Sequence, residues 1–250
     1  MPRVVRRLNQ SDITEELIDA SRSLCQSVDR FEFAEPITHV YNPLRYARRS
    51  HEAYLALARR TTRVVFLGMN PGPWGMAQTG VPFGEISAVR DWMGIDQPVE
   101  KPPMEHPKRP IEGLQCGRSE VSGRRLWGLF QSRFDSPERF FEDHFVLNYC
   151  PLVFMESSAR NRTPDKLPAV ERSPLDEVCD EHLRRVLATL QPQWAVGVGA
   201  YAEACLKRVT ATLNAAPSVS RILHPSPASP AANRDWAGTA TEQLSRAGIW

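Results

Sequence analysis

Four short apolar runs stand out along an otherwise mixed chain. They cover residues 64–69, 145–150 and 194–198, and a fourth centres on 221–223 with its flanks. Their apolar positions are consecutive rather than alternating, which is typical of strands buried on both faces of a parallel sheet. The pattern therefore predicts four buried strands.

Helical periodicity fills the segments before and between these runs. Apolar residues recur at helical spacing in 11–29, 46–60, 126–134, 175–190 and 200–209, and Trp236, Ala240 and Leu244 mark a closing helix. Strands that alternate with helices predict an α/β fold with a mostly parallel sheet and helices on both faces. We expect a single domain over residues 1–250, in which residues 1–40 form an N-terminal helical extension.

Polar residues follow the predicted strands at one edge of the sheet. Asn70 comes after the first strand, Asn148 lies at the end of the second and His224 follows the fourth. In open α/β sheets, ligands bind outside the carboxyl ends of the strands. The sequence therefore predicts that these three side chains contribute to one site.

The loop at 68–84 carries the strongest signal of ligand binding. It contains five glycines and three prolines, and no charged side chain. Its functional groups are two amides, a hydroxyl and two aromatic rings, namely Asn70, Gln78, Thr79, Trp74 and Phe83. Such groups suit a flat, neutral, hydrogen-bonding molecule such as a nucleobase. The alternative is that the glycines only serve tight turns; neither phosphate-binding glycine motif is present.

Three other features each allow a structural and a functional interpretation. His224 is either structural or donates to an oxygen that becomes anionic. Asn148, in a buried strand, either satisfies a neighbouring backbone group or reads a ligand such as the N3–H and O4 edge of uracil. The proline-rich segment 224–230 is either a rigid helix-capping turn or a wedge that enters a nucleic-acid groove.

Composition narrows the function classes. The chain has 31 basic and 29 acidic residues, a net charge of +2, which excludes a strongly cationic coat. Its five cysteines are dispersed without a C-x-x-C pair, so we expect reduced thiols in an intracellular protein and no metal site. Neither a signal peptide nor an apolar run long enough to span a membrane is present in the sequence. We expect no membrane association.

From about Tyr41 to the C-terminus, the chain resembles the single-strand-selective monofunctional uracil-DNA glycosylases, a branch of the uracil-DNA glycosylase superfamily. The similarity rests on five motifs, at 68–84, 224–230, 148–152, 106–110 and 119–123. The resemblance implies a central four-stranded parallel sheet flanked by helices, which agrees with the four predicted strands. Two positions depart from the family: Trp74 replaces a phenylalanine, and Ala228 replaces the arginine of vertebrate members.

The resemblance also implies roles for individual residues. Asn70 positions the attacking water, and His224 stabilises the negative charge that grows on uracil O2. Asn148 reads the pyrimidine and Phe83 stacks on it. The 5-position is flanked by Met69 and Gly72. The DNA wedge corresponds to Pro225, Ser226, Pro227, Ala228, Ser229, Pro230, Asn233 and Arg234.

The implied activity is hydrolysis of the N-glycosidic bond of uracil and of 5-modified uracils such as 5-hydroxymethyluracil. The substrates are single-stranded and duplex DNA, the product is an abasic site, and no lyase step, cofactor or metal is expected. The loop carries no general base, so we expect His224 to dominate catalysis, and the small Ala228 to increase reliance on single strands. We expect a monomer, located in the cytoplasm or nucleoid of a bacterium or in the nucleus of a eukaryote.

Three alternatives remain at this point. The first, and the nearest to the implied activity, is a superfamily member that acts mainly on xanthine or hypoxanthine. A catalytically weak module that binds single-stranded nucleic acid through Trp74 and Phe83 is the second. The third, a nucleotide-dependent α/β enzyme, is disfavoured by the absent phosphate motif.

Overall fold

A parallel four-stranded sheet organises the computed structural model, which describes residues 9–250. The strands are β2 (Val64–Gly68), β3 (His144–Asn148), β6 (Trp194–Val198) and β7 (Ser218–Ile222), in the order β3-β2-β6-β7. All five positions of β2 and of β3 are buried, as their continuous apolar sequences predict. The predicted four-stranded parallel sheet is therefore confirmed. The prediction that its fourth strand is buried is wrong: in β7 only Ile222 is buried, because this strand lies at the edge of the sheet.

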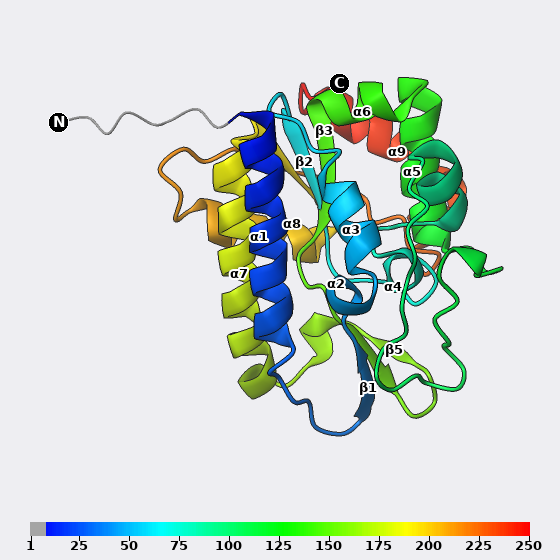
Figure 1. The fold of residues 1–250 in the computed structure, drawn as a ribbon. Helices are drawn as coiled ribbons and strands as arrows, with labels where there is room; N and C mark the ends of the chain where they lie inside the picture. The colour runs from blue at the N-terminus through cyan, green and yellow to red at the C-terminus, as the bar shows by residue number, and fades with distance from the viewer. Residues whose placement is uncertain (1–8) are drawn as a thin grey trace.

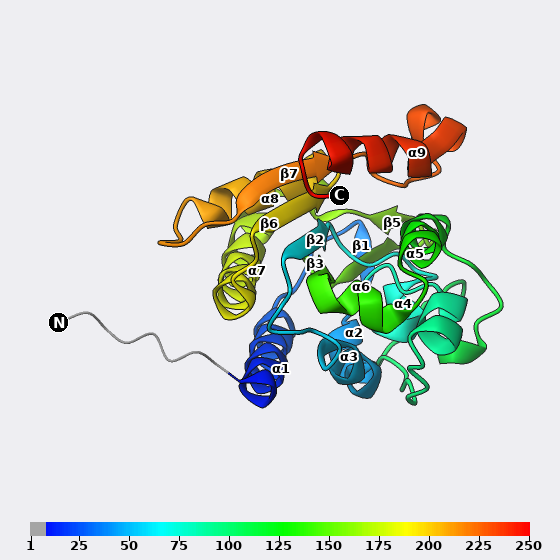
Figure 2. The same ribbon diagram turned by 90° about the horizontal axis from the view of Figure 1, so that it is seen from above.

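Helices cover both faces of this sheet (Figure 1). On one side lie α1 (Gln10–Val28), α7 (Ala169–Leu190) and α8 (Ala200–Thr210). On the other side lie α5 (Val121–Phe134), α6 (Pro137–Asp143) and α9 (Pro230–Arg246). The view from above shows α9 running beside β7 (Figure 2). No helix within residues 9–250 is long and apolar enough to cross a bilayer.

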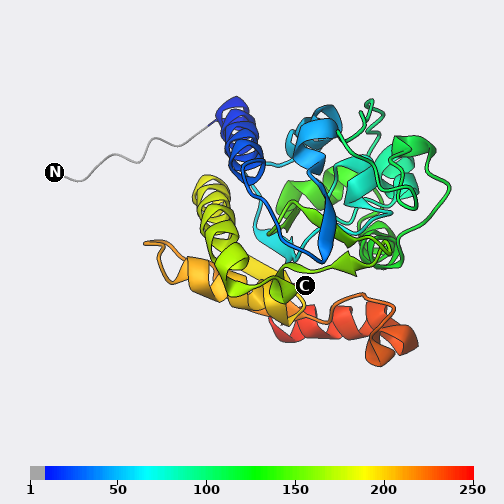
Figure 3. The same cartoon turned by 90° about the horizontal axis from the view of Figure 1, so that it is seen from below.

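The first helix packs as part of this layered structure. Asn9 caps α1 by accepting a hydrogen bond from the Asp12 amide, and the Asp12 carboxylate accepts one from the Asn9 amide. Ile13, Leu17 and Leu24 are buried, and α1 lies against α7 (Figure 3). The expected N-terminal extension before Asn9 lies outside the described residues.

A second, antiparallel sheet was missed by the sequence pattern. It consists of β1 (Ile37–Tyr41), β4 (Val153–Glu156) and β5 (Asn161–Arg162), and it lies beyond the carboxyl edge of the four-stranded sheet (Figure 1). The expected helix at 46–60 is also wrong in detail. Ala47 leaves helical geometry, at φ −105° and ψ 24°, and separates α2 (Pro43–Tyr46) from α3 (Arg48–Leu55).

The remaining elements are short. They are α4 (Met76–Thr79), a π-helical turn at Ala88–Trp92 and 3-10 turns at Gly113–Gln115 and Pro164–Lys166. Between β2 and α5 the chain is otherwise irregular, and Tyr41 fixes part of it. The Tyr41 hydroxyl donates to the Arg109 carbonyl at 2.8 Å and accepts from the His106 amide at 2.6 Å.

Candidate functional site

Five of the six residues expected to perform catalysis or bind the substrate base line one cavity. This cavity has a volume of about 320 Å³ and lies at the carboxyl edge of the parallel sheet. Its wall comes from the segment after β2, from the start of α5, from β5 and the residue that follows it, and from the segment after β7. The lining residues are Met69, Asn70, Pro71, Gly72, Phe83, Glu120, Ser122, Asn161, Thr163, His224 and Ser226.

Phe83 forms an aromatic wall of the cavity in a constrained conformation. Its φ of 53° lies in the left-handed region, which non-glycine residues rarely adopt. The ring packs directly on Gly68: a Cβ atom at that position would lie 2.4 Å from Phe83 Cε2. Gly68 is therefore required for the ring to take this position, and strained residues of this kind are concentrated at functional sites.

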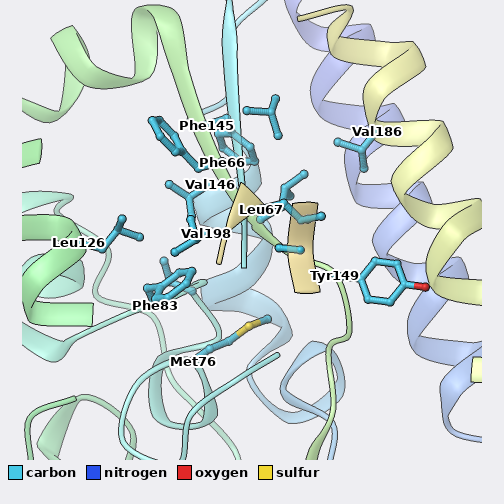
Figure 4. Close-up of a cluster of buried hydrophobic side chains, with 14 of the residues drawn as sticks. Phe66, Leu67, Met76, Phe83, Leu126, Phe145, Val146, Tyr149, Val186 and Val198 are labelled. Atoms are coloured by element: carbon cyan, nitrogen blue, oxygen red, sulfur yellow. The ribbon is translucent and has the colours of Figure 1, made fainter. Parts of the chain in front are cut away.

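Asn148 is the exception, because it does not line this cavity. It pairs with Gly68 in the β2–β3 register, and its Nδ2 atom donates to the Met76 sulfur at 3.2 Å. Its Oδ1 atom is buried without a hydrogen-bond partner and lies beside the Phe83 ring, against Gly68. Met76 and Phe83 occupy the same end of the core in Figure 4. A buried acceptor without a hydrogen bond lowers the stability of the fold by about 1–3 kcal/mol. A ligand that donates a hydrogen bond to this oxygen would remove that penalty.

Asn70 presents one defined polar atom to the cavity. Its Nδ2 atom donates to the Leu152 carbonyl at 3.1 Å. The amide orientation is therefore fixed, and Oδ1 is the atom left to accept a hydrogen bond from water or a ligand.

The position of His224 is fixed by hydrogen bonds of the preceding residue, Leu223. The Leu223 amide donates to Gln243 Oε1 at 2.7 Å, and the Leu223 carbonyl accepts from Trp236 Nε1 at 2.7 Å. Both partners lie on α9. Burial lowers the pKa of His224 below its ordinary value, so the imidazole is neutral at pH 7 and has one N–H to donate. Its ring centre lies 6.3 Å from that of Phe83.

Glu120 is a component of the cavity that the sequence analysis did not single out. It occupies the N-cap position of α5, and its carboxyl group packs where Gly72 and Gly75 have no side chain. Its Oε2 atom is buried without a hydrogen-bond partner, and burial raises the pKa of Glu120 to about 7. The only sequence signal was its place in the 119–123 motif, because nothing local predicts that this glutamate is buried.

The cavity thus offers an aromatic face, an amide oxygen, a neutral imidazole and a buried carboxyl group. Within the described part of the chain, no three His, Cys, Asp or Glu side chains are grouped to hold a metal ion. These groups suit the binding of a flat polar molecule. The imidazole is also placed to stabilise negative charge that develops during a reaction.

The residues expected to enter DNA directly follow His224 in the chain. Pro225 is buried, whereas Pro227, Ala228 and Pro230 are exposed. Ser226 accepts from the Ala228 amide, and Ser229 caps α9 by accepting from the Ala232 amide. We call residues 225–230, with Asn233 and Arg234, the wedge segment.

Within the wedge segment, Asn233 has a structural task. Its Nδ2 atom donates to the Pro227 carbonyl at 2.8 Å, and its Oδ1 atom accepts from Arg125. Arg234 follows it and is exposed at the start of α9. Arg234 is therefore open to a ligand, whereas the Asn233 amide is already used.

Arg125 on α5 was also missed by the sequence analysis, and it ties the wedge segment to the cavity wall. Its Nη1 atom donates to the Pro225 carbonyl at 3.1 Å and to the Ser226 carbonyl at 3.4 Å. Its Nη2 atom donates to Asn233 Oδ1 at 2.9 Å. A helix that begins at the cavity therefore also holds the wedge segment in shape.

We expect Arg125→Ala to loosen the wedge segment. Hydrogen bonds from charged donors contribute about 1.5–3 kcal/mol each when fully formed, so the variant is expected to lose about 1–2 kcal/mol of unfolding free energy at this partly exposed place. Amide hydrogen exchange at Ala228 and Ser229 should accelerate. Arg124→Ala is the matched control, because within residues 9–250 the Arg124 side chain donates only to Ser119, at 3.4 Å. Equal exchange in the two variants would contradict the role given to Arg125.

Comparison with known proteins places the chain in a family. It is 46% identical over 245 residues to the single-strand selective monofunctional uracil DNA glycosylase of Bos taurus, which covers 98% of this chain and 88% of the bovine protein. The Mus musculus protein of the same name is 45% identical over 238 residues, which is 95% of this chain and 85% of the mouse protein.

The solved structure of wild-type SMUG2 from Pedobacter heparinus shares the fold. Its TM-score is 0.68 at 16% sequence identity, over 94% of this chain and 97% of that one. The family model of the uracil DNA glycosylase superfamily matches residues 56–244. The family resemblance noted in the sequence is confirmed: the chain belongs to the uracil DNA glycosylase superfamily and, within it, to the single-strand selective monofunctional uracil-DNA glycosylases.

Proposed function

We propose that this chain is a monofunctional DNA glycosylase that excises uracil and 5-modified uracils and leaves an abasic site. The observation that carries the proposal is the convergence of Asn70, Phe83 and His224 on one cavity of about 320 Å³. Curated relatives at 45–46% identity carry the name of such an enzyme. The cavity supplies the water-binding, stacking and anion-stabilising groups that the reaction needs.

Base recognition is proposed to combine stacking with one buried acceptor. A pyrimidine stacks on the Phe83 ring, which Gly68 allows to lie close to the strand. The unsatisfied Oδ1 atom of Asn148 lies beside that ring and would accept from the N3–H of uracil. Cytosine lacks this N–H, so the same oxygen would disfavour it.

Tolerance of 5-substituents is proposed to come from the wall around Met69 and Gly72. Gly72 has no side chain, and the Glu120 carboxyl group occupies the place that a Cβ atom would take. The Glu120 carboxyl group lies against Gly72 and is a polar neighbour for a substituent such as hydroxymethyl. This part of the cavity therefore suits a 5-modified base better than an apolar wall would.

The proposed chemistry depends mainly on the leaving group. The bond between C1′ and the base N1 breaks, its electron pair goes to the base, and the deoxyribose becomes oxocarbenium-like. His224 donates a hydrogen bond to uracil O2, where the negative charge grows. Asn70 Oδ1 holds the water that adds to C1′. On addition this water gives one proton to the solvent, and the departed uracil anion takes up one proton, so the products are the abasic site and neutral uracil. No lysine is among the residues lining the cavity, which supports hydrolysis without a lyase step.

Base extrusion from a duplex costs a few kcal/mol, and a single strand avoids most of this cost. The wedge segment is proposed to occupy the space that the base leaves, with the small, exposed Ala228 at its tip. We therefore propose activity on both forms of DNA, with faster excision from single strands.

The proposal is tested with labelled strands that carry uracil, 5-hydroxymethyluracil, xanthine, hypoxanthine or thymine, each offered single-stranded and in a duplex. After incubation, alkali converts abasic sites into breaks. We expect breaks at uracil and 5-hydroxymethyluracil, more rapidly in single strands, and none at thymine. Breaks mainly at xanthine or hypoxanthine would show that the proposed substrate class is wrong. Binding of the strands without breaks would show that the chain is a binding module and not a glycosylase.

A further inference from the structure

Two arginine side chains lie over the ring of Trp74, in the loop that follows β2. The guanidinium carbon of Arg109 is 4.8 Å from the centre of the Trp74 ring, and that of Arg118 is 4.6 Å from it. The two guanidinium groups are therefore no more than about 9.4 Å apart. We call these three residues the Arg–Trp–Arg cluster.

The positive charge of this cluster is not neutralised by the protein. Within residues 9–250, neither Arg109 nor Arg118 forms an ion pair with a carboxylate. Arg109 is anchored through carbonyl groups, since its Nη2 atom donates to Ala159 at 3.3 Å. Arg118 is exposed. Two cations at this separation are only partly screened at physiological salt, so an anion bound between or beside them would be stabilised.

Two residues of the cluster belong to segments that also supply the cavity wall. Trp74 lies two residues after Gly72, and Arg118 lies two residues before Glu120; both Gly72 and Glu120 line the cavity. The Glu120 carboxyl group packs against Gly75, next to Trp74, and so joins the two segments. The two segments that carry Trp74 and Arg118 are thus joined to each other at Glu120, a residue of the cavity wall.

We propose that the Arg–Trp–Arg cluster binds a backbone phosphate of the DNA strand that carries the extruded base. This inference rests on the proposed function and adds a contact outside the base pocket and the wedge segment. A guanidinium group matches the geometry of a phosphate with two parallel N–H donors, and tryptophan is the strongest aromatic partner for a cation. Stacking on Trp74 restricts the two side chains before the strand arrives and so lowers the ordering cost of binding.

The test measures the affinity for an undamaged single strand by fluorescence anisotropy over a series of salt concentrations. For Arg118→Gln we expect about 3- to 10-fold weaker binding at low salt, and a slope of log affinity against log salt that is smaller by about 0.7, the value for one phosphate contact on a single strand. Trp74→Leu keeps both charges, so it should weaken binding about threefold with an unchanged slope. Arg118→Lys should also retain the slope, since it keeps the charge.

Arg139→Gln is the matched control. Arg139 is exposed on α6, which precedes β3 and so lies at the opposite edge of the sheet from the cavity. If Arg118→Gln behaves like this control, the proposal is wrong. Inorganic phosphate and chloride are also compared as competitors at equal ionic strength. If phosphate displaces the strand and chloride does not, the cluster is a site for free phosphate, and the proposal is wrong. Because the strand carries no uracil, the result is independent of excision: loss of binding in Arg118→Gln would stand even if the wild type released no uracil.

Discussion

Replacing His224 with alanine is expected to lower the rate of uracil excision by about 10²–10³-fold, the usual loss when one donor to a developing oxyanion is removed. The loss should be this large because the other groups in the cavity offer little compensation. Asn70 is an amide and does not act as a strong base, so the reaction depends on stabilising the departing base. The measurement is the single-turnover rate on a single-stranded uracil oligonucleotide, with enzyme in excess.

Binding and folding need to be separated from catalysis in this experiment. Ser220→Ala changes β7, which leads to His224, without touching the cavity, and should keep the wild-type rate. The His224→Ala protein should also bind the uracil strand within a few-fold of the wild type. Near-normal turnover in His224→Ala, or an equal loss in Ser220→Ala, would refute the assignment of His224 as the anion-stabilising residue.

Replacing Glu120 with glutamine is expected to increase stability at alkaline pH by about 1–3 kcal/mol, by the linkage between pKa and folding. Burial raises the pKa of Glu120 from its ordinary value of 4.5 to about 7 in the folded protein. Between these two values the folded protein keeps a proton that the unfolded chain has released. The contribution of this residue to stability therefore falls as pH rises through the window, and stays low above it.

Urea unfolding at pH 5 and pH 8 measures the effect. The difference between the Glu120→Gln variant and the wild type should be larger at pH 8 than at pH 5, because glutamine does not ionise. Glu177→Gln removes an exposed carboxyl group from α7 and serves as the control. If both variants shift stability by the same amount at both pH values, Glu120 is not the buried acid described above.

Sequence patterns predicted the parallel sheet because three of its strands, β2, β3 and β6, are buried at almost every position and lie between helices. β2 and β3 have no exposed position, so their composition alone identifies them. The antiparallel sheet was missed because β1 mixes buried and exposed positions and β5 has only two residues. Such strands are defined by their partners across the sheet, and a local window does not contain those partners.

The same distinction explains which site residues were found. Asn70 and His224 follow strands whose parallel arrangement brings their carboxyl ends together, so their proximity could be predicted. Glu120, Arg118 and Arg125 are charged residues in or next to the segment 97–123, which is rich in proline and charge, so solvent exposure is the ordinary expectation for them. The burial of Glu120 and the contacts of Arg118 and Arg125 arise only from tertiary packing. The role of Asn148 remains a prediction, since its side chain does not line the cavity and its Oδ1 atom is buried beside the Phe83 ring.

Under the proposed function, the bonds from Arg125 have a consequence for how the protein searches DNA. Ordering a loop residue costs about 1–2 kcal/mol of backbone entropy, and a projection that folds only on contact would incur that cost at every encounter. Here Arg125 and Asn233 hold the Pro225–Pro227 turn before any strand is present. The entropy is lost once, when the chain folds. Each later encounter can then be short, because a site without damage has no conformational change to reverse before the protein moves on.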